Sequence, residues 1–249
     1  AGFVKNLSIR KSLVFLNQET FADKIQICDK AWHIHGMPHI EHNRVTGVLN
    51  RLLTDSKHSK HTNIENIHVL ARYLMNHIYP GVLNKPASGM SNFSKPYQLG
   101  IIDLRYIYKP YEIITNDMRS MGAKKDTRWI KKSICATRSI VNIHKKSSKI
   151  GFEPVLLQEY LVGINIRVHV IGLKYSASQI IANAVDYRYA KKIRQKDIVL
   201  PTKIAKECID IARQLDLPFA GIDLIYAQKK YWILEVNPAP GYHFFENNK

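Results

Sequence analysis

One stretch near the C-terminus constrains the fold more than any other part of this sequence. Residues 219–241 read FAGIDLIYAQKKYWILEVNPAPG, in which two apolar runs flank a polar QKK turn. Two strand-forming runs around a short polar segment indicate a β-hairpin. If Ala227 and Tyr231 close a three-residue loop, Asp223 lies directly opposite Glu235. A shift by one residue in either direction would place Asp223 on the other face.

The polar residues of this hairpin form a candidate metal site. In the register above, Asp223 and Glu235 have Cβ atoms about 5 Å apart on one face. Asn237 joins that face, because alternate residues of a strand point the same way. Two carboxylates and an amide oxygen suit Mg²⁺, which keeps its other positions for water and phosphate groups. A hairpin with two surface acids is the alternative. The Asn-Pro-Ala-Pro-Gly exit favours the metal site, because it fixes the chain just beyond the ligands.

The length of the chain and its apolar runs limit the class of protein. Its 249 residues are enough for one large domain or two small ones. No run approaches the about 18 apolar residues of a membrane span, so we expect no membrane partner. The N-terminus lacks a signal-peptide core. The three cysteines are odd in number and far apart, which suits a reducing compartment. We therefore expect a cytoplasmic protein.

The charge of the chain points to an anionic partner. The formal net charge is +17, which suits nucleotide phosphates, an acidic peptide or nucleic acid. A compositional bias towards Lys, Ile, Asn and Tyr is the alternative, since it raises the charge without any binding role. Most of the basic runs lie in the middle third of the chain. This distribution favours a phosphate site there.

Residues 1–92 are expected to form a first α/β unit. Residues 12–16 suit a strand, and apolar residues from Ile64 to Ile78 recur with helical spacing. Asn63 can cap that helix. A short strand at 82–83 then leads into a loop over 84–94. Four histidines also lie close together in this unit. They fit a polar loop better than a metal site, because no helical HExxH spacing appears; they are His33, His35, His39 and His42.

The middle of the chain alternates between short strands and helices. Ser94 can cap a helix expected over 95–108, with Pro96 tolerated in its first turn. The helix before the hairpin has its apolar face at Ile204, Cys208, Ile211, Ala212 and Leu215. The expected strands are 111–115, 129–134, 139–143, 155–161, 164–170 and, as the hairpin partner of the last, 179–185.

Seven short segments in this order resemble the ATP-grasp superfamily, and within it the RimK-like carboxylate–amine ligases. Each segment is weak alone, but their order is specific. The resemblance covers roughly residues 85–246. The segments are NFSKPYQ ending at Gln98, WIKKSI at Ile134, LQEYL at Leu161, GINIR at Arg167, DYRY at Tyr189, FAGIDL at Leu224 and LEVNPAPG at Gly241.

The resemblance implies a role for individual residues. Asp223, Glu235 and Asn237 match the metal ligands of the family, in agreement with the hairpin argument. Lys132 matches the lid lysine that reaches the nucleotide phosphates, whereas Lys131 is expected to point away. Arg167 and Arg188 match cations near the phosphates or the acyl-phosphate, and together with Lys132 they are the expected catalytic residues; a loop arginine on a basic surface is the alternative for Arg188. The expected nucleotide contacts are Lys95, Lys132, Arg138, Ser139, Gln158, Asn165 and the backbone of Glu159, Tyr160 and Leu161.

Two departures from the family pattern affect the nucleotide site. The loop after Lys132 contains no glycine, although the family usually cradles phosphates there with backbone N–H groups. The side chains of Thr137 and Ser139, with Arg138, could take over that role. Asn165 stands where the family usually has an acid near the ribose.

The implied fold is α+β. It is an ATP-grasp fold whose two α/β lobes clamp ATP, preceded by a small Rossmann-like α/β unit. The expected boundaries are 1–92 for that unit and 93–249 for the ATP-grasp domain. Within the domain we expect a lid at about 110–155 and a metal-binding subdomain at about 156–249.

The implied activity is ATP- and Mg²⁺-dependent ligation of a carboxylate to an amine through an acyl-phosphate, with Mn²⁺ as an alternative ion. The two substrates are not identified by the sequence, and the positive charge suits an acidic peptide or protein tail. A phosphotransferase of the same fold is one alternative. A basic module that binds nucleotide or nucleic acid without catalysis is the other, and the intact metal trio argues against it.

Overall fold

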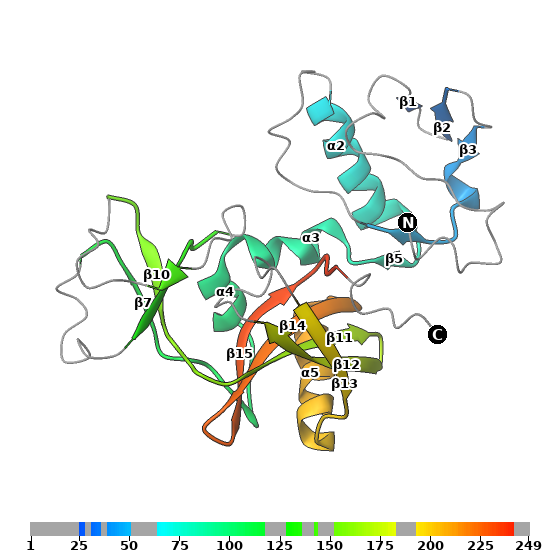
Figure 1. Ribbon diagram of the computed structural model, residues 1–249. Helices are drawn as coiled ribbons and strands as arrows, with labels where there is room; N and C mark the ends of the chain where they lie inside the picture. Colours follow the sequence, from blue (N-terminus) through cyan, green and yellow to red (C-terminus); the bar gives the residue numbers. More distant parts are fainter. Residues whose placement is uncertain are drawn as a thin grey trace. The chain divides into compact units, whose positions relative to one another are not determined.

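The computed structural model describes residues 25–27, 31–35, 39–50, 64–117, 128–135, 142–143, 152–182 and 193–241. The chain divides into two compact units (Figure 1). The first unit comprises residues 1–89 and 241–249, and the second comprises residues 90–240. Among the described residues, no helix is long and apolar enough to cross a membrane.

The first unit contains two small sheets. One is antiparallel, with the order β1-β2-β3, and the other is the parallel pair β4-β5. The connection from β4 to β5 passes through α2, which makes a single β-α-β crossover. This crossover is the only parallel pairing within the described part of the unit, so the Rossmann-like arrangement stays a prediction. The strands are Ile25–Ile27, Ala31–Ile34, Ile40–Glu41, Val48–Leu49 and Val82–Leu83.

Helix α2 (Ile64–Tyr73) contributes Ala71 to the core of the first unit, on the face that its helical spacing predicts. It continues into a π-helical turn, η3 (Leu74–Ile78). The wider turn changes the periodicity, and Ile78 is exposed although the spacing places it on the apolar face. The buried apolar residues are Trp32, Ala71, Leu74, Met75, Tyr79 and Val82.

A buried polar contact links the antiparallel sheet of this unit to the segment that follows η3. The hydroxyl of Tyr79 accepts a hydrogen bond from the Trp32 indole N–H and lies 2.7 Å from Nδ1 of His42. His42 therefore has a structural partner. A 3-10 turn, η2 (His42–Arg44), follows β3. At the end of the unit, α3 (Pro86–Gly89) is helical although its composition predicts a loop, and Asn76 Oδ1 accepts the N–H of Ala87 at 3.1 Å.

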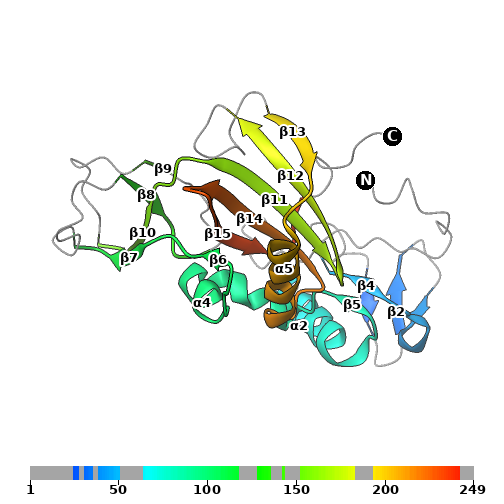
Figure 2. The ribbon, with the colours of Figure 1, turned by 90° about the horizontal axis from the view of Figure 1, so that it is seen from below.

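The second unit is built on a six-stranded sheet with the order β13-β12-β11-β14-β15-β6 (Figures 1 and 2). All neighbours are antiparallel except β15 and β6, which are parallel. Strand β12 pairs with β11 as predicted, but it begins at Lys174 because Gly172, with φ of +57°, forms a tight turn directly after β11. The strands are Ile107–Tyr108 (β6), Ile164–Ile171 (β11), Lys174–Ala182 (β12), Ile193–Ile198 (β13), Phe219–Ala227 (β14) and Lys230–Asn237 (β15).

In the hairpin of β14 and β15, Asp223 pairs with Glu235 as predicted, but the loop and the register that produce this pairing differ from the prediction. The loop has two residues, Gln228 and Lys229, both with positive φ, and Ala227 pairs with Lys230. That is the two-residue turn whose twist matches the strands, so the prediction of a three-residue loop is wrong. A register shift next to Asp223 then brings Asp223 opposite Glu235. The bulge supplies the one residue that the shorter loop removes.

Helix α5 (Thr202–Gln214) covers one face of this sheet (Figure 2). All five apolar residues predicted for its inner face are buried. They pack in one cluster with Ile222 and Leu224 of β14 and with Val168 of β11. Side chains alternate between the faces of a strand. The intervening residues of β11 and β14, including Arg167 and Asp223, therefore point to the opposite face.

A four-stranded antiparallel sheet with the order β7-β10-β8-β9 forms the other β-layer of the second unit (Figure 2). Its strands confirm the predicted positions within a few residues. Where the chain is described, they are Glu112–Thr115 (β7), Trp129–Lys132 (β8), Asn142–Ile143 (β9) and Val155–Glu159 (β10).

Helix α4 (Lys95–Gly100) begins where predicted but is much shorter than the predicted 95–108. Ser94 Oγ caps it by accepting the N–H of Tyr97. A 3-10 turn, η4 (Met90–Phe93), precedes it in place of the predicted loop. Side chains of helix α5 form hydrogen bonds with the backbone after Gly100. Gln214 bonds both backbone groups of Asp103, and the Glu207 carboxylate accepts the N–H groups of Arg105 and Tyr106.

Candidate active site

The polar face of the six-stranded sheet carries the predicted metal ligands. Asp223 pairs with Glu235 on β15 and with Arg167 on β11, so the three side chains share one face. Asn237 lies two residues beyond Glu235, opposite Gly221. The predicted hairpin register places Asp223, Glu235 and Asn237 on one face, and the alternation of apolar residues over 164–170 places Arg167 on the polar face of its strand.

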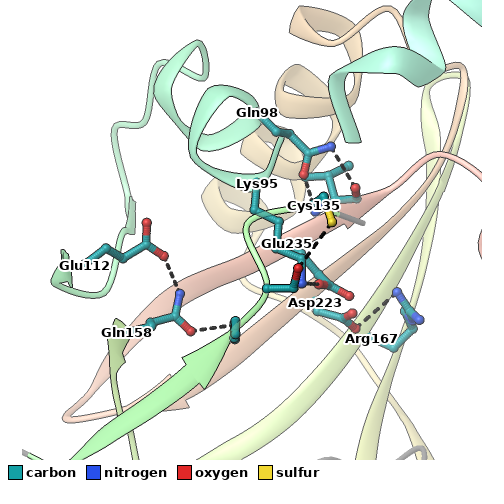
Figure 3. Close-up of polar contacts among 11 residues, drawn as sticks. Lys95, Gln98, Glu112, Cys135, Gln158, Arg167, Asp223 and Glu235 are labelled. Carbon is teal, nitrogen blue, oxygen red and sulfur yellow. Dashed lines mark hydrogen bonds and ion pairs between the residues drawn. The ribbon is translucent and has the colours of Figure 1, made fainter. Parts of the chain in front are cut away.

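Both carboxylates of this face form ion pairs. Nη1 of Arg167 lies 3.1 Å from Oδ1 of Asp223, and Nζ of Lys95 lies 3.8 Å from Oε2 of Glu235. Figure 3 shows Lys95 reaching Glu235 from α4 and Arg167 reaching Asp223 from β11. The Lys95 side chain is only 5% exposed and that of Arg167 8% exposed. Buried charges of this kind require a partner, and here each cation has one.

The Asn-Pro-Ala-Pro-Gly segment after the hairpin is held in place, as its sequence predicts. Oδ1 of Asn237 accepts the N–H of Ala239 at 2.9 Å, which closes a turn directly after β15. Pro240 then packs over Gly221, where an added Cβ would lie 2.5 Å from the Cβ of Pro240. Gly221 therefore leaves the space that the exit segment occupies. The amide oxygen of Asn237 has a second lone pair that remains available to a metal ion.

The donor set fits a magnesium ion that completes its coordination from outside the protein. Within the described ranges, no three His, Cys, Asp or Glu side chains are grouped closely enough to hold a metal ion. The donors that the chain offers on this face are the carboxylates of Asp223 and Glu235 and the amide oxygen of Asn237. Mg²⁺ is usually bound by one or two carboxylates together with substrate phosphates and water. This set suits the ion when a nucleotide accompanies it.

A buried polar chain in the four-stranded sheet carries the second predicted lysine. Nζ of Lys132 donates to Oε1 of Gln158 at 2.7 Å, and Nε2 of Gln158 donates to Oε1 of Glu112 at 2.5 Å (Figure 3). Gln158 is fully buried. Its amide thus separates the ammonium of Lys132 from the nearest carboxylate in the sheet. Lys131 points to the other face of β8, as predicted.

The charges of the two sheets affect one another. Burial lowers the pKa of the Lys132 ammonium, Glu235, Glu112 and Asp223 oppose this shift, and Lys95 adds to it. Burial raises the pKa of the Glu112 carboxyl, and the hydrogen bond from Gln158 and the nearby lysines oppose it. The backbone explains this proximity. The N–H of Lys95 donates to the carbonyl of Ile134 at 3.1 Å, which ties α4 to the end of β8.

In the segment that connects the two sheets, two of the residues predicted to contact adenine already use their backbone N–H groups within the protein. The N–H of Glu159 donates to the Tyr111 carbonyl at 2.9 Å, and that of Tyr160 donates to the Arg128 carbonyl at 2.8 Å. Leu161, the third residue predicted to contact the adenine through its backbone, has no backbone acceptor for its N–H within the described residues. Asn165 lies opposite Ile225 on the polar face of the sheet.

Next to Leu161, the same face of the sheet becomes apolar. Leu161, Ile225 and Ala227 are buried in one cluster, with Trp232 and Leu234 packed against it. Gly163 permits this close approach, because an added Cβ there would lie 2.3 Å from the Tyr226 carbonyl oxygen. One face of the hairpin is therefore apolar near its turn and polar near its open end.

The structure adds two residues to the site, and several predicted residues lie outside the part of the chain that it describes. Gln98 and Glu112 contact site residues, but the sequence predicted no role for either. The signals for Gln98 are its place in the NFSKPYQ segment and its spacing of one helical turn from Lys95. Cys135 lies 3.2 Å from the Ser133 hydroxyl. Of the four clustered histidines, His42 is buried and the other three are exposed. The predicted features outside the described residues are Arg138, Ser139, Thr137, Arg188, Asn63 and residues 12–16.

Two β-layers are joined by a short linker, a carboxylate pair on one of them is met by Arg167 and Lys95, and a buried lysine of the other lies within electrostatic reach of that pair. This is the arrangement expected of an ATP-grasp domain. Residues 108–241 match the ATP-grasp domain family. The match covers 134 of the 249 residues, and the chain belongs to this family. No curated protein sequence matches the chain significantly.

Solved structures of ATP-grasp ligases share the fold. The macrocyclase MdnC from Microcystis aeruginosa MRC, bound with its precursor peptide MdnA, is 16% identical with a TM-score of 0.74 over 93% of this chain and 84% of that one. A RiPP-associated ATP-grasp ligase from Chryseobacterium gregarium, in complex with ADP and a leader and core peptide, is 16% identical with a TM-score of 0.71 over 89% and 78%.

A third solved structure is the ATP-grasp ligase PsnB, complexed with a phosphomimetic variant of its minimal precursor, Mg and ADP. It is 23% identical with a TM-score of 0.63 over 73% of this chain. The chain spans 62% of the length of that PsnB chain. At these identities the likeness shows the fold, and the membership in the RimK-like group stays a prediction.

Proposed function

We propose that this chain is an ATP- and magnesium-dependent ligase that joins a carboxylate to an amine through an acyl-phosphate. One observation supports it above the others. The paired carboxylates Asp223 and Glu235 are met by Arg167 and Lys95, and Lys132 lies within electrostatic reach of both acids. Three buried cations beside a magnesium-type donor set suit a nucleotide triphosphate better than a structural salt-bridge network.

The hairpin face has an apolar part and a polar part, as a nucleotide has an apolar base and charged phosphates. The apolar cluster beside Leu161 suits an adenine base, with the Leu161 N–H as its donor. The polar end, with Asp223, Glu235 and Asn237, suits the phosphates and their metal ion. The base and the phosphates would therefore lie along one face of β14 and β15, covered by the four-stranded sheet as a lid.

The protein contributes positioning and charge neutralisation to the reaction. An oxygen of the substrate carboxylate attacks the γ-phosphorus, the bond to the β,γ-bridging oxygen breaks, and ADP leaves. The amine nitrogen then attacks the carbonyl carbon, the bond to the phosphate oxygen breaks, and the amine proton passes to solvent. When bound, Mg²⁺ neutralises phosphate charge, and Asp223, Glu235 and Asn237 would hold it. Lys132 and Arg167 offset charge on the transferred group.

We infer that the carboxylate belongs to a peptide. The net charge of +17 favours an acidic partner. Several structural neighbours are bound to precursor peptides, which agrees with a peptide as substrate. The finer assignments belong to the same proposal: a RimK-like ligase with a lid, Mn²⁺ as an alternative ion, and a cytoplasmic location.

The first test is the thermal shift produced by ADP with Mg²⁺. Any ligand that binds only the folded state raises its stability, by about 2.7 kcal/mol at a concentration of 100 times Kd. We expect a magnesium-dependent shift in the wild type and none, or a much smaller one, in Glu235→Gln. The ligand-induced shift is compared within each variant, because Glu235→Gln also leaves Lys95 without its partner and lowers the starting stability.

Asp210→Asn provides the matched control. Asp210 is an exposed acid on α5, paired with Arg213 at 2.8 Å, and it lies outside the site. Its variant should keep the wild-type shift with ADP and Mg²⁺. If the wild type itself shows no shift, the fold has lost its nucleotide site and the proposal is wrong.

Product analysis separates ligation from the other activities of this fold. Acidic peptides are incubated with ATP and Mg²⁺, and the products are weighed by mass spectrometry. A ligase yields a product that has lost one water per bond formed, together with one ADP. A stable phosphorylated peptide would identify a phosphotransferase instead. Nucleotide binding without turnover, combined with steeply salt-dependent binding of nucleic acid, would point to a non-catalytic module.

A further inference from the structure

The side chain of Gln98 is bonded to the backbone between two predicted metal ligands. Its Nε2 donates to the carbonyl of Val236 at 2.9 Å, and its Oε1 accepts the N–H of Val236 at 3.0 Å (Figure 3). Val236 lies between Glu235 and Asn237 on β15. Both Gln98 and Val236 are fully buried. One side-chain amide therefore satisfies both backbone groups of one strand residue.

The position of this contact follows from the sheet. Strand β6 pairs with β15 at Tyr231 and Trp232, and no other described strand covers that edge. In an antiparallel pair the backbone groups of alternate residues point to the same side. Those of Val236 point to Gln98, so those of Glu235 and Asn237 point to β14. Gln98 thus takes the place of a missing neighbouring strand at the open end of β15.

The same helix also reaches the ligand side chain. Lys95 precedes Gln98 by three residues on α4, and its ammonium lies 3.8 Å from Oε2 of Glu235. Residues three apart on a helix lie on the same side. Helix α4 therefore contacts the side chain of one ligand through Lys95 and the following peptide group through Gln98.

We propose that Gln98 is a positioning residue for the metal site, which fixes the backbone of β15 so that Glu235 and Asn237 face Asp223. This inference rests on the proposed function. Without the Gln98 amide, the last residues of β15 would have no partner on their outer side, and the two ligands would lose their common orientation towards β14. Residues that orient metal ligands typically change metal affinity by about 10–100-fold when they are replaced.

The chain offers a matched control in Gln214. Its side chain makes the same two-point contact with a backbone, accepting the N–H of Asp103 at 2.7 Å and donating to the Asp103 carbonyl at 3.1 Å. That contact is exposed to solvent at the end of α5, where it holds the segment after α4, and it touches none of the predicted ligands. A comparison of Gln98→Met with Gln214→Met therefore separates the loss of a backbone contact from the loss of ligand positioning.

The measurement is the Mg²⁺ concentration that gives half of the thermal shift with ADP, in the full chain. We expect Gln98→Met to raise this concentration by about 10-fold or more. Binding of ADP without Mg²⁺ should remain within about twofold of the wild type. Gln214→Met should lower the starting stability and leave the Mg²⁺ requirement unchanged. In the metal-free protein, the amide hydrogen of Val236 should exchange faster in Gln98→Met, which needs no nucleotide to be observed.

A second variant covers the case in which Gln98→Met does not fold. Gln98→Glu keeps the length and the acceptor but loses the donor to the Val236 carbonyl. Its carboxyl can donate that bond only when protonated, so the excess Mg²⁺ requirement over the wild type should shrink as the pH is lowered.

The outcomes distinguish this inference from the proposed function. If the wild type shows no magnesium-dependent shift, the proposed function is wrong and the inference falls with it. If the wild type shows the shift and Gln98→Met has the same Mg²⁺ requirement, only the positioning role is wrong. An equal rise in Gln214→Met would show that general loosening of the unit, and not ligand orientation, sets the metal affinity.

Discussion

The two sheets of the second unit neutralise buried charge in different ways. In the six-stranded sheet, the cations contact carboxylates directly, as Arg167 and Asp223 do at 3.1 Å. In the four-stranded sheet, the neutral amide of Gln158 lies between Lys132 and Glu112. No carboxylate among the described residues lies within ion-pair distance of Lys132.

This difference shows how completely each buried cation is compensated by the protein itself. A direct ion pair offsets much of the desolvation of both charges. An amide relay leaves both ends undercompensated, so burial lowers the pKa of Lys132 and raises that of Glu112. Arg167 and Lys95 each have a carboxylate partner before any ligand binds, whereas the partner of Lys132 is a neutral amide. We therefore propose that Lys132 gains most from an added anion such as a phosphate.

The largest effect is expected for the direct pair. Arg167→Met leaves the Asp223 carboxylate buried without its cation, and breaking one side of a buried pair costs about 3–5 kcal/mol. We expect the free energy of unfolding to fall by about 3 kcal/mol, because both side chains keep slight solvent exposure. Urea denaturation of the ligand-free protein measures it.

The exposed pair on α5 is the control for that measurement. Arg213→Met removes the contact with Asp210. The Arg213 side chain is 77% exposed and that of Asp210 is 48% exposed, so the free energy of unfolding should fall by less than about 1 kcal/mol. The double variant Arg167→Met with Asp223→Leu should recover much of the lost stability, because it removes the orphaned charge. If Arg167→Met costs no more than Arg213→Met, the proposed contrast between the two sheets does not hold.

A smaller effect on stability is expected for Lys132→Met. Removing this buried ammonium relieves its desolvation, but it leaves Oε1 of Gln158 without its donor, which costs about 1–3 kcal/mol. The two contributions oppose each other. The net change in the free energy of unfolding should therefore be about 1 kcal/mol or less. The thermal shift with ADP and Mg²⁺ should nevertheless be largely lost.

Lys131→Met is the matched control, since the two lysines are adjacent on β8 and point to opposite faces. It should keep both the stability and the nucleotide-induced shift. A loss of stability in Lys132→Met as large as in Arg167→Met would mean that Lys132 is a structural cation, and the assignment of Lys132 to a ligand would then be wrong.

Local patterns predicted much of the six-stranded sheet. The alternation in β11 and the spacing of the apolar residues in α5 identified both elements and the face that each one buries. The pairing of Asp223 with Glu235 was also predicted, although the loop and the bulge that produce it were not. The polar QKK segment does not reveal which two residues adopt positive φ, and either loop length suits it.

Contacts between distant segments could not be predicted in the same way. Helix α4 ends at Gly100 because the backbone that follows forms hydrogen bonds with Gln214 and Glu207, which are more than a hundred residues away in the sequence. No local pattern indicates these hydrogen bonds. The same limit applies to Gln158, which sequence order places near the nucleotide but whose amide is used between Lys132 and Glu112.

The smallest effect is expected for Glu112→Gln, at the far end of the relay. Burial raises the pKa of this carboxyl above its ordinary value of 4.5, so the folded state binds the proton more tightly than the unfolded chain. Its contribution to stability is full below about pH 4.5 and is lost as the pH rises through the raised pKa. The amide resembles the protonated carboxyl and can still accept from Gln158. Glu112→Gln should therefore stabilise the protein at neutral pH by about 1 kcal/mol at most, allowing for solvent screening, and the gain should vanish in acid.

Urea denaturation at several pH values measures this change in the free energy of unfolding, with Asp210→Asn as the control. A loss of stability at neutral pH would mean that the attraction between Glu112 and Lys132 outweighs desolvation, and that the relay neutralises its charges as well as a direct pair does.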